Sequence, residues 1–275
     1  GPIERAEQLL PQLEKDHSFD TDKAIEGAKL IAWGYFKKIA IADVVVSCVN
    51  AVYDQVTAYT GLALGVATFF YAFQVYCDFS GYSDIARGVA KLLDIDLMTN
   101  FKSPYFAASL KEFWSRWHIS LSTWFRDYVY IPLGGSRKGA WRTRRNLLVT
   151  FLVSCLWHGA SWTFVIWGGL HGLGQIVEKE WNRHFPPRKD RRSALRVLLV
   201  FIFVCAAWIF FRANSFSDAI YVVTHLFDGV GNPVSYVKEG YLALRSAGSM
   251  QSSDLKLGFV WIAVLLAQAW IELKQ

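Results

Sequence analysis

Residues 154–172 read SCLWHGASWTFVIWGGLHG, which places two histidines among tryptophan, leucine, phenylalanine, valine and isoleucine. An imidazole is costly to bury in apolar surroundings unless both ring nitrogens find partners. His158 stands directly before a short Gly-Ala-Ser break, and His171 follows in a glycine-rich run. The stretch therefore predicts two helices joined at the break, with two ionisable groups in an apolar setting.

The composition around this stretch is typical of a membrane protein. Hydrophobic residues make up 53% of the 275, and aromatic residues reach 16%. Tryptophan and tyrosine are enriched where a protein crosses from lipid to water. The four cysteines lie far apart without a CxxC pair, so the sequence predicts neither a disulfide framework nor a zinc site.

Several apolar stretches approach the ~20 residues that a helix needs to cross a ~30 Å hydrocarbon core. Residues 61–79, 195–211 and 255–271 are the clearest, and residues 39–56 are a weaker candidate because they contain an aspartate and an asparagine. Residues 146–179 form a longer apolar stretch around the Gly-Ala-Ser break. We expect these segments to enter the membrane.

Two basic loops flank the longest stretch. Residues 137–145 carry five Lys or Arg and no acid, and residues 183–192 carry five with one aspartate. Short basic loops stay in the cytoplasm, so the chain between them enters the membrane and returns. His158 and His171 each lie twelve or thirteen residues from the nearer loop. At ~1.5 Å per residue, both histidines should lie past the middle of the membrane.

Irregular backbone at that depth requires contact with protein or with a water-filled cavity. We therefore expect His158 to face a cavity inside the membrane. The alternative is a histidine that only packs and bonds a neighbouring helix, and for His171 this alternative weighs equally. Ionisable groups inside a membrane are nevertheless functional in most cases.

Residues 105–128 show apolar side chains at helical spacing with charged residues on the other side, which predicts a helix lying in the interface or wedged beside a cavity. On such a helix His118 lies on the flank of the apolar stripe, either at a site or as a histidine with a water-exposed tip. Arg116 and Arg126 would attract phosphate groups arriving from the cytoplasm.

Residues 77–88 place a further polar cluster at the end of an apolar stretch. Asp84 and Arg87 are three residues apart and can pair on one helix face. Alternatively, Asp78 or Asp84 shapes a polar cavity or orients an imidazole.

The remaining segments are more ordinary. We expect the charged residues 1–24 to lie outside the membrane, residues 216–227 to form a short amphipathic helix, and residues 228–254 to form a polar loop. No HExxH, Walker or GxSxG motif is present, and the six histidines are not spaced as metal ligands. Nucleic acid is not needed to explain the basic loops, so no nucleic-acid partner is predicted.

Five blocks together resemble the membrane-bound O-acyltransferase family, and especially its bacterial branch that O-acetylates polysaccharides such as alginate. They are DFSGYSDIARG at 78–88, NFKSPY at 100–105, EFWSRWHISLSTWFRDYVYIPLGGSRKG at 112–139, WHGASWTFVIWGGLHG at 157–172 and WIFFRA at 208–213. One departure is GLHG, because relatives often carry an aromatic residue before that histidine.

The resemblance implies an all-α, polytopic fold: a ring of tilted transmembrane helices, with re-entrant and interfacial helices, around a central tunnel. It implies one membrane domain over residues 1–275, with its best-matching core at 60–215, in the bacterial cytoplasmic (inner) membrane. Family members carry further spans before a GPI-type segment, so the start at GPI leads us to expect that N-terminal spans are absent from this chain.

The resemblance also implies roles. His158 corresponds to the family's membrane-embedded histidine and His118 to its second functional histidine, which makes them the predicted catalytic residues. Predicted tunnel-lining or supporting residues are His171, Asp78, Asp84, Tyr105, Trp114, Trp117, Arg116 and Trp157.

In the predicted reaction, His158 removes a proton from an acceptor hydroxyl, and the oxygen attacks an acetyl thioester. The donor is acetyl-CoA or another acetyl thioester on the cytoplasmic side, and no bound cofactor or metal is predicted. The acceptor is an extracytoplasmic polysaccharide, reached directly or through a partner protein. The alternative is a non-catalytic conduit or assembly subunit of a polysaccharide export or modification complex.

Overall fold

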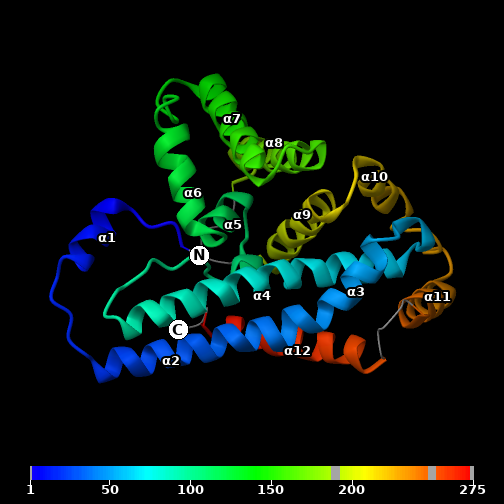
Figure 1. The fold of residues 1–275 in the computed structure, drawn as a ribbon. Coiled ribbons are helices and arrows are strands. Elements are labelled where there is room, and N and C mark those ends of the chain that lie inside the picture. The colour runs from blue at the N-terminus through cyan, green and yellow to red at the C-terminus, as the bar shows by residue number, and fades with distance from the viewer. Residues whose placement is uncertain (1, 187–192, 247–251, 273–275) are drawn as a thin grey trace. The chain divides into compact units, whose positions relative to one another are not determined.

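The computed structural model describes residues 2–186, 193–246 and 252–272, and all regular structure in these residues is helical (Figure 1). The expected all-α fold is therefore confirmed for the described part of the chain. The chain divides into two compact units, one of residues 1–100 and 221–275 and the other of residues 101–220.

The first unit is built on one long helix, α4, and on a helical run that folds back along it. Its elements are α1 (Ala6–Leu13), α2 (Thr21–Tyr35), the π-helix η1 (Phe36–Ala42), α3 (Asp43–Tyr53), η2 (Val56–Ala58), α4 (Leu62–Leu92), α11 (Pro233–Ser246) and α12 (Ser252–Glu272). Helices α2 and α3 both pack against α4, and α12 packs against α3.

Glycines set the close antiparallel approach of α2 and α4. A Cβ atom at Gly34 would lie 2.6 Å from the carbonyl oxygen of Gly81, and one at Gly88 would lie 2.5 Å from that of Gly27. Contacts this short exclude any side chain, so the two backbones meet directly at both places. Small residues perform the same function between helices in membranes.

A buried ion pair joins η1, which follows α2, to α4. Lys37, in η1, is 4% exposed and pairs with Asp84 of α4. The predicted pairing of Asp84 with Arg87 is confirmed at 3.6 Å. A π-helix inserts an extra residue into a helical turn and often marks a functional or strained position.

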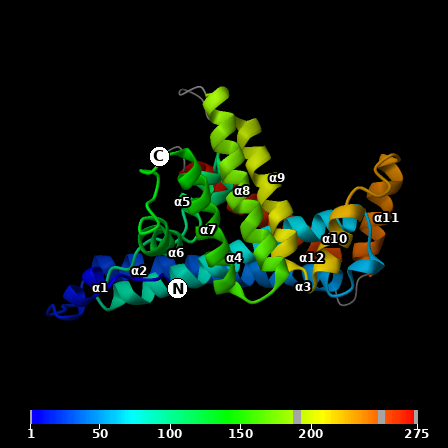
Figure 2. The same ribbon diagram turned by 90° about the horizontal axis from the view of Figure 1, so that it is seen from above.

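The second unit contains the helical hairpin predicted from the sequence. Its elements are η3 (Pro104–Phe106), α5 (Leu110–Arg116), α6 (Ile119–Phe125), the π-helix η4 (Arg126–Tyr130), α7 (Ala140–His158), α8 (Trp162–His184) and α9 (Ala194–Arg212). Helices α7 and α8 pack against each other, and α9 lies along α8 (Figure 2).

Two described helices, α4 and α9, are long and apolar enough to cross a membrane, and α12 carries a shorter apolar stretch, Leu255–Trp270. The expected span at 39–56 does not form one α-helix, because η1 extends to Ala42 and α3 ends at Tyr53. The other expected stretches lie on α4, α9, α12 and the α7–α8 hairpin.

The prediction of one continuous helix over 105–128 is wrong, although part of this segment lines a cavity. Helices α5 and α6 are seven residues each and are separated at Trp117 and His118. His118 has φ 44°, in the left-handed region, and the Trp117 carbonyl accepts a hydrogen bond from the Ser122 hydroxyl instead of continuing the helix. Helical spacing of the apolar residues therefore did not reveal the backbone turn.

The expected loop at 228–254 is also partly wrong, because α11 spans Pro233–Ser246. Asn232 accepts a hydrogen bond from the Ser235 amide at 3.2 Å, and Pro233 begins the helix. Proline is well suited to a first helical turn, where its missing N–H group is not needed. Residues 247–251 lie outside the described residues. The expected amphipathic helix at 216–227 is confirmed as α10 (Phe216–His225).

The charged N-terminal segment is fastened to the end of α4. Asp94 accepts hydrogen bonds from Lys23 and Lys15, and it has φ 59°. The hydrogen bond from Lys23, with smaller contributions from Lys15 and His17, lowers the pKa of Asp94 to about 2. Four charged or ionisable side chains thus gather just beyond the long apolar helix.

Candidate active site

The Gly-Ala-Ser break separates α7 from α8 as the sequence predicts. Helix α7 ends at His158 because Gly159 has φ 149°, and a Cβ atom there would lie 2.8 Å from the ring of Phe164. Ser161 then begins α8 by accepting a hydrogen bond from the Thr163 amide at 3.3 Å. His158 therefore occupies the last helical position before the tip of the hairpin.

Aromatic rings surround His158, which is half-buried. The rings of Trp167 and Phe211 each lie 5.3 Å from the imidazole, edge to face, and the ring of Phe164 lies 6.3 Å away. Phe211 comes from α9, so three helices contribute to this environment. The prediction that His158 faces a cavity remains a prediction.

His171 lies on the next helix and is completely buried. Its Nδ1 accepts a hydrogen bond from the indole Nε1 of Trp114 at 3.2 Å. An indole N–H group can only donate, so Nδ1 carries no proton in this arrangement and Nε2 carries the proton of the neutral ring. The bond between α5 and α8 thus fixes the tautomer of His171.

His118 sits at the turn between α5 and α6 and is 8% exposed, so the alternative of a water-exposed tip is wrong. Its Nδ1 lies 3.4 Å from the Ser120 hydroxyl, and its ring stacks on Phe101. Burial, with a smaller contribution from His158, lowers the pKa of His118 to about 3. The ring is therefore neutral at physiological pH and is suited to hydrogen bonding rather than to taking up a proton.

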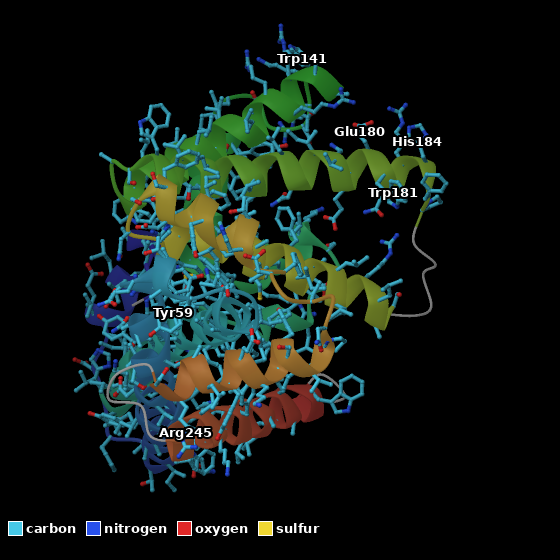
Figure 3. The ribbon with its side chains drawn as sticks, turned by 90° about the vertical axis from the view of Figure 1, so that its right-hand side faces the viewer. Tyr59, Trp141, Glu180, Trp181, His184 and Arg245 are labelled. Atoms are coloured by element: carbon cyan, nitrogen blue, oxygen red, sulfur yellow. The ribbon has the colours of Figure 1, made fainter. Side chains whose placement is uncertain are left out.

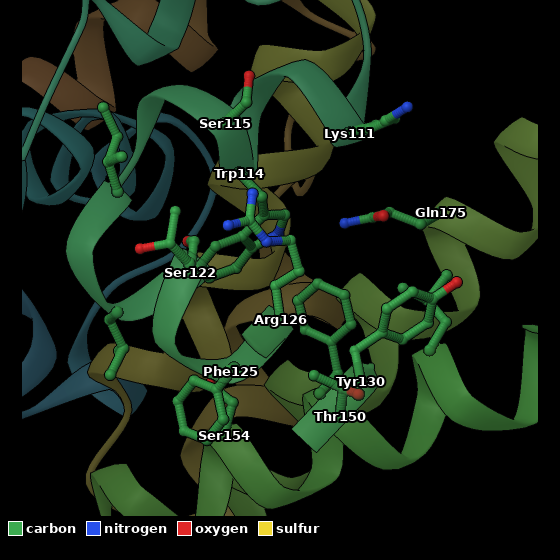
Figure 4. A pocket seen from close by; sticks show the side chains of 15 residues that line it. Lys111, Trp114, Ser115, Ser122, Phe125, Arg126, Tyr130, Thr150, Ser154 and Gln175 are labelled. Atoms are coloured by element: carbon green, nitrogen blue, oxygen red, sulfur yellow. The ribbon is translucent and has the colours of Figure 1, made fainter. Parts of the chain in front are cut away.

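A cavity of about 460 Å³ lies between α5, α6, η4, α7 and α8 (Figure 4). Its apolar walls include Trp114, Leu121 and Phe151, and the side chains of Lys111 and Arg126 bring positive charge to it. Hydroxyl and amide groups complete the lining, from Ser115, Ser122, Thr123, Tyr130, Thr150, Ser154 and Gln175. None of the three histidines lines this cavity.

The cavity and the histidines nevertheless share helix faces. On α7, Thr150 and Ser154 line the cavity, and His158 follows Ser154 at the same interval of four residues. On α8, the lining residue Gln175 continues to His171 at the same interval. Residues four apart lie on one face of a helix. Both helices therefore lead from the cavity to a histidine nearer the hairpin tip.

Close packing of α7 and α8 fixes these two faces relative to each other. A Cβ atom at Gly168 would lie 2.9 Å from both the Cβ atom of Cys155 and the carbonyl oxygen of Phe151. The ring of Phe151 lies 6.2 Å from that of His171, stacked on it. The glycines of the quoted stretch thus allow an aromatic cluster to form between the helices.

Two predicted supporting residues, Trp117 and Tyr105, stack beside this cluster. The ring of Trp117 lies 6.0 Å from that of Tyr105 and 5.6 Å from that of Phe113. Arg116 forms an ion pair with Glu112 at 2.7 Å. Trp157 is 68% exposed, so it does not line the described cavity.

The two predicted aspartates belong to the first unit. Asp84 pairs with Lys37 and Arg87, and Asp78 lies 2.8 Å from Lys38. The contact with Arg87 matches the simpler interpretation of Asp84, in which the two residues pair on one helix face. A role in shaping a tunnel stays a prediction.

Two residues of this site were not singled out from the sequence. Trp167 lies between His158 and His171, with its ring 5.3 and 5.2 Å from theirs. Both Glu178 carboxylate oxygens accept a hydrogen bond from the Leu110 amide, at 2.9 and 3.1 Å, which caps α5. Spacing on α8 could have revealed Trp167, which is four residues before His171, whereas no local signal links Glu178 to Leu110.

Among the described residues, no group of three or more His, Cys, Asp or Glu is arranged to hold a metal ion. The described site itself offers imidazole, indole, hydroxyl and basic side chains.

Known proteins resemble this chain over most of its length. The family model of the membrane-bound O-acyltransferases (MBOAT) matches residues 28–217. The protein named "Probable alginate O-acetylase AlgI" from Azotobacter vinelandii is 38% identical over 266 residues, which cover 96% of this chain and 51% of that protein. The peptidoglycan O-acetyltransferase of Helicobacter pylori is 38% identical over 230 residues, covering 81% of this chain and 43% of the relative.

A more distant relative has a different named substrate. The teichoic acid D-alanyltransferase of Streptococcus thermophilus is 30% identical over 209 residues, covering 70% of this chain and 50% of that protein. The chain thus spans about half the length of the curated relatives it matches.

Proposed function

Because the chain belongs to the membrane-bound O-acyltransferase family, we propose that it takes part in moving an acetyl group from a cytoplasmic thioester to hydroxyl groups of an extracytoplasmic polysaccharide. The observation that carries the proposal is the continuity between the cavity and the histidines. Lining faces on α7 and α8 lead from a partly basic cavity to His158 and His171.

The cavity suits a thioester donor. Its lining combines apolar walls with the basic side chains of Lys111 and Arg126. A donor such as acetyl-CoA has phosphates at one end and a less polar arm that carries the acetyl group at the other. We assign the phosphates to the basic side chains, because Arg and Lys form charge-assisted hydrogen bonds with phosphate. The arm would then extend along α7 and α8 toward His158.

His158 is the proposed general base. It takes the proton from the acceptor hydroxyl as the oxygen attacks the thioester carbonyl, and the proton then passes to the departing thiolate. General-base catalysis of this kind contributes about 10²–10⁴-fold in rate. His118 is assigned a supporting role as a neutral hydrogen-bonding group, in agreement with its burial and lowered pKa.

The acceptor is proposed from what the relatives share. The names of these relatives refer to alginate, peptidoglycan and teichoic acid. We infer that the acceptor here is a hydroxyl-bearing polymer of the same kind, reached directly or through an extracytoplasmic partner protein. The proposed setting is a multi-pass protein of the bacterial inner membrane, with helices arranged in a ring around a tunnel.

The substitution His158→Ala tests the proposal. We expect it to abolish acetylation of the surface polymer, because no base remains to activate the acceptor. The measurement is the acetyl content of the polymer in cells that lack the native gene and express the full protein or its variant. Membrane accumulation of the variant is measured by immunoblot in the same cells.

His184→Ala is the matched control, because His184 is an exposed histidine in the last turn of α8. It should leave acetylation unchanged. Normal acetylation by a His158→Ala protein that accumulates normally would rule out His158 as the base. Polymer export without any acetyl turnover in the unaltered protein would favour a conduit instead of an enzyme.

A further inference from the structure

Two buried N–H groups in the aromatic cluster that includes Trp167 have no acceptor among the described residues. They are Nε1 of Trp167 and Nε2 of His171. The exposed fractions of the two residues are 1% and 0%. Buried polar groups in native proteins are hydrogen-bonded in the great majority of cases, so each exception needs an explanation. Here two exceptions occur in one aromatic cluster.

Both groups can act only as donors toward a missing partner. The indole nitrogen of Trp167 has no acceptor capacity. His171 uses Nδ1 to accept the hydrogen bond from Trp114 at 3.2 Å, which leaves Nε2 with the proton of the neutral ring. An additional partner must therefore offer an acceptor atom, and a single oxygen has the lone pairs to accept from two donors.

The two donors are also neighbours. Trp167 and His171 are one turn apart on α8, and their ring centroids lie 5.2 Å apart with an interplanar angle of 72°. The imidazole of His158 lies 5.3 Å from the Trp167 ring. The indole ring of Trp167, which carries one donor, therefore lies next to both the proposed base and the second donor, His171.

Other rings make the surroundings of these two donors apolar. Phe113, Phe151 and Phe203 lie within 5.7 to 6.2 Å of the His171 ring. In such apolar surroundings, preorganised donors stabilise a developing negative charge much more than they would in water. Donors placed beside a base, and aimed at an oxygen that becomes negative, form an oxyanion hole.

We propose that Trp167 Nε1 and His171 Nε2 donate hydrogen bonds to the carbonyl oxygen of the acyl thioester. This inference rests on the proposed acyl transfer. The acceptor oxygen forms a bond to the carbonyl carbon, and the carbonyl π electrons move onto the oxygen held by the two donors. When the carbonyl re-forms, the C–S bond breaks and the thiolate leaves with the proton that His158 had taken. Atoms and charge balance without any other reactant.

Substitutions that remove only the N–H groups test this role. Trp167→Phe and His171→Phe both keep an aromatic ring. We expect each to lower kcat by about 10²–10³-fold, the usual effect of losing one oxyanion-hole donor. The KM for the donor should change little, because these bonds strengthen in the transition state. The assay uses membranes containing the full protein, with radiolabelled acetyl-CoA as the probe and labelled polymer as the product.

His171→Gln and Trp181→Phe are the matched controls. Glutamine can accept from Trp114 with its carbonyl and donate with its amide, so it should restore part of the activity lost in His171→Phe. Trp181→Phe removes an indole N–H group from an exposed residue of α8 outside the aromatic cluster, and it should keep kcat near that of the unaltered protein. If all four variants share the same kcat, or lose stability in proportion to activity, the two residues only pack and the proposal is wrong.

A spectroscopic measurement separates this proposal from the assignment of His158. In membranes of the His158→Ala protein, the infrared carbonyl band of ¹³C-labelled acetyl-CoA should move to lower frequency on binding, because the two donors polarise the bond. The shift should be lost in the double variants with Trp167→Phe or His171→Phe. An active His158→Ala protein with a shifted band would overturn only the base. An inactive one whose band is insensitive to both donors would overturn only the donor pair.

Discussion

Glu178 illustrates how a single residue on one helix can position another helix of the site. Both of its carboxylate oxygens accept the Leu110 amide at the start of α5, and α5 carries Trp114, which bonds His171. The first amides of a helix have no partner within that helix, so this carboxylate satisfies one of them. Glu178 therefore supports the donor pair indirectly, through α5 and Trp114.

We predict that Glu178→Ala lowers the free energy of unfolding by about 1.5–3 kcal/mol, the range for a hydrogen bond to a charged group. Glu178→Gln should lose less, since its amide oxygen still accepts from Leu110. The midpoint of thermal unfolding of the detergent-solubilised protein, read by intrinsic fluorescence, measures both. Equal unfolding midpoints for the alanine variant and the unaltered protein would show that the cap contributes nothing.

At the residue scale, the sequence indicated which ionisable groups to examine but not their surroundings. Both His158 and His171 were noticed because an imidazole is unusual in an apolar stretch. The tautomer of His171 depends on Trp114, which is 57 residues away. The turn at His118 depends on a left-handed backbone that helical spacing does not encode. Pattern reasoning identifies a face of a helix, whereas the residue that covers this face comes from tertiary packing.

Helices α2 and α4 meet at glycines, so a larger residue at this crossing should push the two helices apart. Gly81→Ala should destabilise the first unit by about 1–3 kcal/mol, because the new Cβ atom would lie 2.7 Å from the carbonyl oxygen of Gly34. Backbone atoms cannot move aside as a flexible side chain can. Accumulation in membranes and the unfolding midpoint should both fall.

Gly169→Ala provides the control for this substitution. Gly169 lies within α8, and nothing is within 4 Å of a Cβ atom placed there. Alanine favours the helix over glycine by up to about 1 kcal/mol, so this variant should be as stable as the unaltered protein or more stable. If the two variants behaved alike, helix propensity and not the close crossing would control the effect.

Helices were predictable where an apolar stretch was long enough and ended at helix-breaking residues. The α7–α8 hairpin has long apolar helices and a clear Gly-Ala-Ser break, and it forms as expected. Residues 105–128 lack such a signal at the turn, since the turn at His118 uses no glycine or proline. Helix α11 was missed because its glycine and serine residues suggested a loop, although Gly240 packs closely on Leu62.

An ion pair holds together the end of the α7–α8 hairpin that is opposite its tip. Arg144 of α7 pairs with Glu180 of α8 at 2.7 Å, so the first turns of α7 and the last turns of α8 lie at one end, as Figure 3 shows for Trp141, Glu180 and His184. The predicted basic loops adjoin this end, although residues 187–192 lie outside the described residues. Helix α7 is 19 residues long, or about 28 Å.

We therefore expect a cysteine at position 141 to react with a membrane-impermeant thiol reagent only from the cytoplasmic side. A cysteine at 162, at the hairpin tip, should not react from that side. Both Trp141 and Trp162 are 75% exposed, which makes the two substitutions comparable. The four native cysteines are first replaced, and labelling is compared in intact cells and inverted vesicles. Labelling of both positions from the same side would contradict the hairpin topology.

At the scale of the whole molecule, the sequence predicted membrane association and the general helical class better than the arrangement of helices. Hydropathy depends on composition, which each segment carries by itself. The pairing of α2 with α4 depends instead on glycines that face each other across 47 to 61 positions of chain, as Gly34 with Gly81 and Gly27 with Gly88 show. No periodic signal within either segment encodes that match.

The buried pair of Lys37 with Asp84 also has a consequence for biosynthesis. A buried lysine or aspartate that lacks its partner leaves an uncompensated charge, which costs about 3–5 kcal/mol. Asp84 follows Lys37 by 47 residues, so Lys37 leaves the ribosome well before its partner exists. We expect the run from α2 to η1 to stay unpacked until α4 has been made, and Lys37 to become buried only when Asp84 is present to neutralise it.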